Sequence, residues 1–221
     1  MPKPTEIHVS PKTEDVRFVT HKSLAELQKQ EIDTINPHSF SGVSVTQGFA
    51  SGEIRMEANV KLGYQTNTRT QMSCVWYDSI EVNFHIRPDI HIAREVYEDR
   101  CMGAAVKEHE LKHVRVDKVI VNKYANIIGR KIYDGLKDRG FIAGPIAAAN
   151  KEAVADRMRQ TVSQIIDLEM KRLELDRMDM QMAVDTKEEY ERVAAQCPDF
   201  KVTPDMLEEE KKAYGLKRYR R

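Results

Sequence analysis

The sequence predicts an α+β fold, in which a small antiparallel sheet with one helix packs against a long antiparallel helical hairpin. Three observations support this prediction. Two stretches in the first half of the chain alternate apolar and polar residues, as expected of strands with one buried face. Two long stretches in the second half repeat apolar residues every three to four positions, as expected of amphipathic helices. The connector between these two stretches is short, which favours antiparallel packing of the helices.

Composition and charge exclude several classes of protein. The chain has 221 residues, and 35 lysines and arginines balance 35 aspartates and glutamates, so its formal net charge is zero. A protein that coats nucleic acid or an anionic membrane needs an excess of positive charge, so the balance gives no strong nucleic-acid signal. No apolar run reaches the roughly 18 residues that a transmembrane helix requires. The N-terminus lacks the apolar core of a secretory signal, which leaves a cytoplasmic location open.

The first part of the chain, residues 1–92, is expected to be rich in β-structure. Alternation around residues 16–18 predicts a short strand. Ser23 and Glu26 have the spacing of a capping box, in which each side chain binds the backbone N–H of the other residue. A helix is therefore expected over about 24–32.

Two longer strands are expected at 53–64 and 74–86, joined by a polar loop. In both stretches most of the alternate positions are apolar, so one face should be buried and the other solvated. Together they should form a long antiparallel hairpin. Pro88 is expected to end the second strand, because proline has no N–H to donate to a ladder. The predicted buried faces consist of Ile54, Met56, Ala58, Val60, Leu62 and Tyr64 in the first strand and Trp76, Ile80, Val82, Phe84 and Ile86 in the second.

The second part, residues 93–197, is expected to form the helical hairpin. Its helices should cover about 95–138 and 151–195, each with an apolar stripe along one side. A chain of this length fits one domain with an appendage, so residues 1–197 are expected to form a single α+β domain.

The last segment, residues 198–221, is expected to contain a short helix and a basic tail. Thr203 and Pro204 predict the start of that helix, as N-cap and first helical residue. The tail interleaves lysines and arginines with tyrosines and could contact RNA or an acidic partner. A solvated terminus is the simpler interpretation.

One motif in the first long helix carries chemistry. His109, Glu110 and His113 form the pattern HExxH. On an α-helix, residues four apart share a face, so the two imidazoles could bind one Zn²⁺ ion. Glu110 would then lie beside the open coordination position, where it could act as the general base of a hydrolysis. The motif therefore predicts a zinc metallopeptidase that acts on a peptide or protein substrate.

A second interpretation of the two histidines stays open. Both fall on the apolar stripe of their helix, and imidazoles that face a buried seam need hydrogen-bond partners. They could be core histidines bonded to carboxylates of the second helix, with no metal. The protein would then be a non-catalytic scaffold or interaction subunit.

A catalytic zinc ion needs a third protein ligand. Asp117 shares the face of His113, but in a straight helix it lies about 12 Å along the axis from His109. It is therefore expected either to orient an imidazole through a hydrogen bond or to form part of a surface pair. If the long helices are antiparallel, Asp176 faces the histidines, and a carboxylate in an apolar seam needs a partner or a metal. Asp176 is the predicted third ligand, with Glu169 as the second choice.

The three cysteines leave the redox state open. Cys74, Cys101 and Cys197 show no CxxC spacing, so no metal or redox motif is indicated. A disulfide between Cys74 and Cys101 could join the sheet to the first long helix in an oxidising compartment. Three reduced thiols fit the sequence equally well.

The segments on both sides of the HExxH motif resemble those of a known group of proteins. Cys74 begins a region that runs through DIHIAREVYEDRC and AAVKEHELKHVRVD to His113 and Asp117, and AVDTKEEYERVAAQC follows near the end of the second helix. Over about residues 15–197 the chain resembles a group of uncharacterised bacterial zinc-dependent proteases of the zincin type. The resemblance implies a small sheet on a helix pair, a zinc site and a periplasmic or envelope location, but no substrate. In zincin-like enzymes an edge strand binds the substrate in extended form, and the strand at 74–86 is the candidate.

Overall fold

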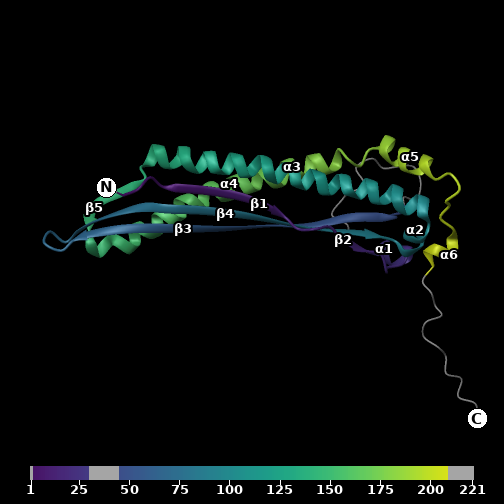
Figure 1. The fold of residues 1–221 in the computed structure, drawn as a ribbon, viewed down its shortest axis with the longest axis horizontal. Helices are drawn as coiled ribbons and strands as arrows, with labels where there is room; N and C mark the ends of the chain where they lie inside the picture. The colour runs from purple at the N-terminus through teal and green to yellow at the C-terminus, as the bar shows by residue number, and fades with distance from the viewer. Residues whose placement is uncertain (1, 30–44, 209–221) are drawn as a thin grey trace, which may run out of the picture. The chain divides into compact units, whose positions relative to one another are not determined.

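The computed structural model describes residues 2–29 and 45–208 and has five strands and six helices among them (Figure 1). The strands are β1 (Glu6–Thr13), β2 (Arg17–Val19), β3 (Gly48–Asn67), β4 (Met72–Ile92) and β5 (Ile142–Ala147). The helices are α1 (Leu24–Leu27), α2 (Arg94–Glu98), α3 (Arg100–Arg139), α4 (Lys151–Met182), α5 (Lys187–Gln196) and α6 (Pro204–Leu207), with a 3₁₀ turn, η1 (Ala148–Asn150), before α4. The α+β class is therefore confirmed.

Strand β4 pairs with each of the other four strands. It is parallel to β1 and β2 and antiparallel to β5. The prediction of a small antiparallel sheet is therefore wrong, because the sheet is mixed and much of its pairing is parallel. Periodicity reveals which residues of a strand are buried, but it carries no information on the direction in which distant strands pair.

The expected long antiparallel helical hairpin is also wrong. The segment between α3 and α4 consists of β5 and η1, and β5 pairs with residues Met72–Trp76 of β4. The second helix expected over 151–195 is two helices, since residues 183–186 separate α4 from α5. The apolar connector therefore forms a strand of the sheet where a plain helix-to-helix loop was expected.

The chain divides into two compact units, each built from three separate segments. Unit 1 consists of 1–15, 52–88 and 115–181, and unit 2 of 16–51, 89–114 and 182–221. Strands β3 and β4 and helix α3 each contribute residues to both units. The division therefore does not follow the boundary near residue 92 that the composition suggests.

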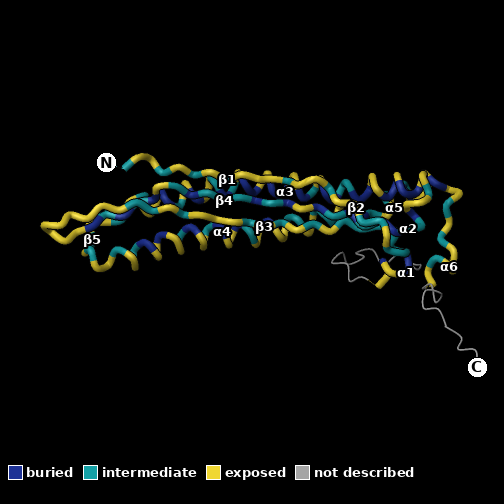
Figure 2. Tube along the Cα trace, turned by 60° about the horizontal axis from the view of Figure 1, so that its bottom comes forward, coloured by how far each residue is buried: buried dark blue, intermediate teal, exposed yellow. Residues whose placement is uncertain are grey.

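The core of unit 1 forms where apolar residues of β4 meet those of α3 and α4. Figure 2 shows buried positions recurring along both helices, as expected of amphipathic helices. Each fully buried aliphatic or aromatic side chain stabilises the fold by about 1.5–3 kcal/mol. The largest contributions come from Ile80, Val82, Phe84 and Ile86 of β4, Ile120, Ile128 and Ile132 of α3, and Val162, Ile166 and Leu173 of α4.

The prediction assigned one residue of β4 to the wrong face. Val75 and Tyr77 are buried, and the buried side then changes from odd to even positions at Ile80. Trp76, which was expected to share a face with Ile80, is only partly buried. A strict two-residue period cannot anticipate such a change of phase within one long strand.

Strand β4 does not end at Pro88, as expected, but continues to Ile92. The residues of β4 that pair with β1 end at Ile86, and those that pair with β2 begin at Asp89. Pro88 thus falls between two ladders, where its missing N–H interrupts neither of them. This is a position at which a strand tolerates proline.

The core of unit 2 surrounds the start of α3. The capping box before α1 is confirmed, because the Glu26 N–H donates to Ser23 Oγ over 3.2 Å and the Ser23 N–H donates to Glu26 Oε2 over 2.6 Å. Helix α1 ends at Leu27, and positions 30–32 of the helix predicted there lie outside the described residues. The buried apolar side chains of this core include Leu24, Leu27, Ile90, Ile92, Val96, Val106, Val114 and Val193.

The predicted C-terminal helix is present as α6, with Thr203 at its N-cap and Pro204 in its first turn. The basic tail lies outside the described residues. Among the helices of residues 2–29 and 45–208, none combines the length and the apolar character needed to cross a membrane.

Candidate metal centre

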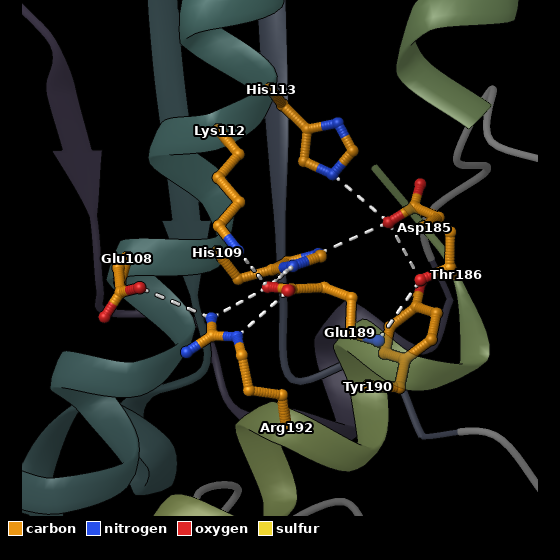
Figure 3. Close-up of polar contacts among 9 residues, drawn as sticks. All are labelled: Glu108, His109, Lys112, His113, Asp185, Thr186, Glu189, Tyr190 and Arg192. Atoms are coloured by element: carbon orange, nitrogen blue, oxygen red, sulfur yellow. Dashed lines mark hydrogen bonds and ion pairs between the residues drawn. The ribbon is translucent and has the colours of Figure 1, made fainter. Parts of the chain in front are cut away.

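Helix α3 contains the HExxH motif, and Figure 3 shows His109 and His113 of this helix pointing toward Asp185. His109 and His113 are 6% and 7% exposed, and Glu110 is 3% exposed. The two imidazole rings lie edge to face with their centroids 5.1 Å apart. The prediction that both histidines are buried on one face of a helix is therefore confirmed.

A third residue, Asp185, brings a carboxylate to both imidazoles. Its Oδ1 lies 3.3 Å from Nε2 of His109 and 3.2 Å from Nε2 of His113. Asp185 is itself buried, at 6% exposed. The ligand atoms of these three residues all lie within 4.8 Å of one another, and no other such group of three occurs within residues 2–29 and 45–208. This group could hold a metal ion.

Local sequence explains why Asp185 lies in this position. Helix α4 ends at Met182, and Thr186 caps the start of α5, with its side chain accepting a hydrogen bond from the N–H of Glu189 over 3.2 Å. Asp185 is therefore the residue before an N-cap, in the bend between two helices. The pair Thr186 and Glu189 has the spacing of a capping box, so the sequence did contain a signal for a new helix beginning at Lys187.

The two predicted third ligands lie elsewhere and have other partners. Asp176 accepts hydrogen bonds from Nζ of Lys123 over 2.6 Å and from the hydroxyl of Tyr124 over 3.0 Å. Glu169 accepts a hydrogen bond from Arg172 over 2.8 Å. The structure thus brings neither Asp176 nor Glu169 into the group of His109, His113 and Asp185, and the register argument that favoured them assumed one continuous second helix.

Asp117 is buried, at 4% exposed. It accepts hydrogen bonds from Arg177 over 2.6 and 3.1 Å and from the side-chain amide of Gln181 over 2.7 Å. The structure therefore gives Asp117 partners around the end of α4 in place of the imidazole that was expected. Its carboxylate neutralises a guanidinium, and the pair belongs to the packing of unit 1.

The predicted disulfide between Cys74 and Cys101 is wrong. Cys101 is bonded to Cys197, with the Cα atoms 5.8 Å apart, and Cys74 is a free thiol. The disulfide joins the beginning of α3 to the C-cap of α5. Spacing along the chain does not determine which cysteines pair, and the break that creates α5 was not expected.

Helix α5 also supplies Glu189, which the sequence analysis missed. Its Oε1 lies 3.2 Å from Nδ1 of His109 and 2.7 Å from Nζ of Lys112, and its Oε2 accepts a hydrogen bond from Nε of Arg192 over 2.9 Å. The hydrogen bond from Arg192 is the main reason why the pKa of Glu189 lies well below its usual range, although burial acts in the opposite direction. Glu189 is therefore ionised.

Tyr190 lies on the same helix and touches the group from another side. Its hydroxyl donates a hydrogen bond to Oδ1 of Asp185 over 3.1 Å, and its ring centroid is 5.6 Å from that of His109. Burial, together with the neighbouring Asp185, raises the pKa of Tyr190 above its usual value. The hydroxyl therefore stays protonated and acts as a donor.

Burial has opposite consequences for the two carboxyl groups nearest the histidines. It raises the pKa of Glu110 to about 7, although the two imidazoles lower it. At Asp185 burial also acts to raise the pKa, but hydrogen bonds from His109 and His113 outweigh it and hold the pKa below its usual range. Asp185 is thus a permanent anion, whereas Glu110 can exchange a proton near neutral pH.

Strand β3 lies against Glu110. The Ala50 backbone acts to lower the pKa of Glu110, against the larger effect of burial. A Cβ added to Gly48 would lie 2.6 Å from Cγ1 of Val106 and 3.4 Å from Oε1 of Glu110, so glycine permits the close approach of strand and helix. The start of β3 therefore lies beside the general-base candidate.

The donor set fits a divalent cation. Both ring nitrogens of His109 face carboxylates, on Asp185 and Glu189, but a neutral imidazole has only one N–H. Oδ1 of Asp185 is also shared by His113 and the Tyr190 hydroxyl. A cation bound by the two Nε2 atoms and this oxygen would interact with the lone pairs of all three atoms, so neither Nε2 atom would need a proton. The single N–H of His109 could then be at Nδ1 and donate to Glu189.

A scan against protein-family models and searches of curated proteins and of solved structures found no match to this chain. The resemblance to zincin-type proteases therefore rests on the sequence alone. Any function must be argued from the chemistry of the site itself.

Proposed function

We propose that the protein is a zinc-dependent peptidase of the zincin type, in which His109, His113 and Asp185 bind the ion and Glu110 is the general base. The observation that carries the proposal is the meeting of two imidazoles and one carboxylate oxygen within 4.8 Å, beside a buried glutamate. Catalytic zinc sites have three protein ligands and one open position, whereas structural zinc sites have four protein ligands.

The ligand types favour zinc over the harder cations. Calcium and magnesium prefer six or more oxygen ligands, often including several waters. Two imidazoles and one carboxylate instead match the nitrogen and oxygen ligands of four-coordinate zinc. Because these ligands are buried, the ion would be held in surroundings of low polarity, where its charge acts strongly on a bound substrate.

The residues around the site suit a hydrolysis. A zinc ion bound there would polarise a substrate carbonyl and make a water molecule more acidic. Glu110 would take a proton from the attacking water and deliver it to the leaving amine, for which a pKa of about 7 is well matched. The start of β3, which approaches Glu110 closely at Gly48, would restrict the movement of the Glu110 carboxylate. The adjacent start of β3 could align an extended peptide by main-chain hydrogen bonds.

Metal analysis and one substitution test the proposal. Protein purified without added zinc should contain about one zinc ion per chain, because the site has a single set of three ligands. Glu110→Gln should retain that zinc and lose peptidase activity against a mixture of unfolded protein substrates. Zinc-free protein, or a Glu110→Gln variant as active as the wild type, would refute the proposal.

Chelation provides a second test that does not depend on finding a substrate. A ligand that binds only the folded state stabilises it by about 2.7 kcal/mol at 100 times its dissociation constant. Removal of the ion with a chelator should therefore lower the unfolding temperature, and added zinc should restore it.

One observation favours a different function. The histidines already have carboxylate partners in Asp185 and Glu189, which is what buried imidazoles need without a metal. We propose as the alternative a non-catalytic scaffold or interaction subunit of a bacterial envelope or secretion assembly. Under this alternative a chelator should leave the unfolding temperature unchanged. Under either function, the disulfide between Cys101 and Cys197 favours an oxidising compartment such as the periplasm.

A further inference from the structure

We infer that Glu189 is the positioning residue of the metal site, which holds the proton of His109 on Nδ1 so that Nε2 can bind the ion. The inference rests on the proposed metal site but not on the identity of any substrate. Helix α5, which also carries Tyr190, would then contact the site at both Asp185 and His109.

The geometry of His109 leads to this assignment. Its Nδ1 lies 3.2 Å from Oε1 of Glu189, while its Nε2 lies 3.3 Å from Oδ1 of Asp185. An ionised carboxylate only accepts hydrogen bonds, so a proton shared with Glu189 must come from the imidazole. With the N–H at Nδ1, the lone pair of Nε2 points toward Asp185 and is free to bind a cation. A hydrogen bond of this kind also makes the imidazole a stronger ligand.

Glu189 is itself held in one position by two cations. Lys112 Nζ lies 2.7 Å from Oε1, and Arg192 donates to both carboxylate oxygens, through Nε over 2.9 Å and through a terminal nitrogen over 2.8 Å. Arg192 also forms an ion pair with Glu108 at 3.4 Å. Bidentate pairing with arginine fixes the orientation of a carboxylate as well as its charge.

The same segment of α3 thus supplies two of the proposed metal ligands and two residues that hold Glu189 and Arg192 in position. Glu108 and Lys112, which bind Arg192 and Glu189, lie beside the two histidines on α3. Figure 3 shows the chain of contacts that runs from Glu108 through Arg192 and Glu189 to His109. A carboxylate so restrained can fix the tautomer and the rotation of one ring, which a solvated side chain cannot do.

Zinc affinity, measured by competition with a fluorescent chelator, tests the inference. Glu189→Gln keeps the shape of the side chain and removes its charge, and should weaken zinc binding by about 10- to 100-fold, as losses of hydrogen-bond partners of ligands generally do. Glu188→Gln is the matched control, because Glu188 is an exposed carboxylate in the same first turn of α5. It should bind zinc within about twofold of the wild type, since only the weak interaction with the helix dipole changes.

The tautomer can be observed directly in the wild type, so the test does not depend on a variant that folds. Long-range ¹H–¹⁵N spectra of the zinc-loaded protein should show His109 protonated at Nδ1, and Glu189→Gln should give a mixture of tautomers or faster exchange of that proton. A proton on Nε2, or a Glu189→Gln variant with wild-type zinc affinity, would overturn the inference alone. Wild-type protein that does not bind zinc would overturn the proposed function as well.

Discussion

Buried carboxylates in the two units of the chain have different kinds of partner. In unit 1, Asp117 binds Arg177 and Glu169 binds Arg172. In unit 2, Asp185 faces two imidazoles. A guanidinium is always charged, so an aspartate beside it is already neutralised and has no need of a metal. A neutral imidazole carries no charge, so the negative charge of an aspartate shared by two imidazoles is balanced only when an imidazole is protonated or a metal ion is bound. Such an aspartate is therefore a candidate ligand.

Burial alone therefore does not distinguish the two kinds of carboxylate. Asp117 and Glu169 are 4% and 3% exposed, and Asp185 is 6% exposed. What separates them is the partner, and the partner depends on three-dimensional contacts that the hydrophobic pattern does not report. Asp176 and Glu169 were predicted because they are acidic residues in an apolar seam, and that property belongs to ion pairs of the core as often as to metal ligands.

Loss of the third ligand should have the largest effect. Asp185→Asn should reduce zinc affinity by more than the roughly 10- to 100-fold loss typical of an outer hydrogen-bond partner, because it removes a charged ligand atom. Asp176→Asn, which changes the residue predicted from the sequence, should leave zinc affinity unchanged. Both affinities can be measured by chelator competition. Equal loss in the two variants would contradict the assignment of Asp185.

Breaking the ion pair between Asp117 and Arg177 in unit 1 should lower stability and leave zinc affinity unchanged. Arg177→Met leaves the buried Asp117 carboxylate without its cation, and breaking a buried pair in this way destabilises a protein by about 3–5 kcal/mol. We expect a loss at or below the lower end of that range, because the Arg177 side chain is 34% exposed and Gln181 still donates a hydrogen bond to Asp117. Denaturant unfolding measures the loss, and zinc affinity should not change. A variant that keeps its stability but loses zinc would show that Asp117 serves the metal site.

The residues of the motif were the part of the site that the sequence could predict. HExxH lies on a helix, and the stripe that contains His109 and His113 is buried, because helical period and side-chain chemistry are both local properties. The same holds for the N-cap Ser23 with Glu26 and for the N-cap Thr203. Each of these predictions depends on residues within about one or two turns.

Asp185, the proposed third ligand, could not be predicted while one helix was assumed over 151–195. The spacing between Asp185 and His113 depends on where α4 ends, and Thr186 with Glu189 marks that point. The cysteine pairing and the parallel partners of β4 failed for a related reason, since both join residues far apart in the chain. Local patterns do not specify which distant segments meet.

A smaller effect is expected where β3 approaches the general-base candidate. Gly48→Ala would place a Cβ 2.6 Å from Cγ1 of Val106, and such overpacking typically destabilises a protein by about 1–3 kcal/mol. The strand should shift away from α3 and change its contact with Glu110. Peptidase activity should therefore fall while zinc affinity is retained. Loss of zinc together with activity would instead place β3 among the supports of the ligands.

The smallest effect is expected at the residue first predicted to bind the metal. Asp176 and Lys123 form an ion pair whose side chains are 40% and 52% exposed. Exposed pairs of this kind often contribute nothing measurable to stability, since solvent and salt screen them. Lys123→Met should therefore leave both the unfolding temperature and the zinc affinity at wild-type values. A lowered zinc affinity in this variant would mean that the charges of unit 1 influence the metal site, and the contrast between the two kinds of carboxylate would then fail.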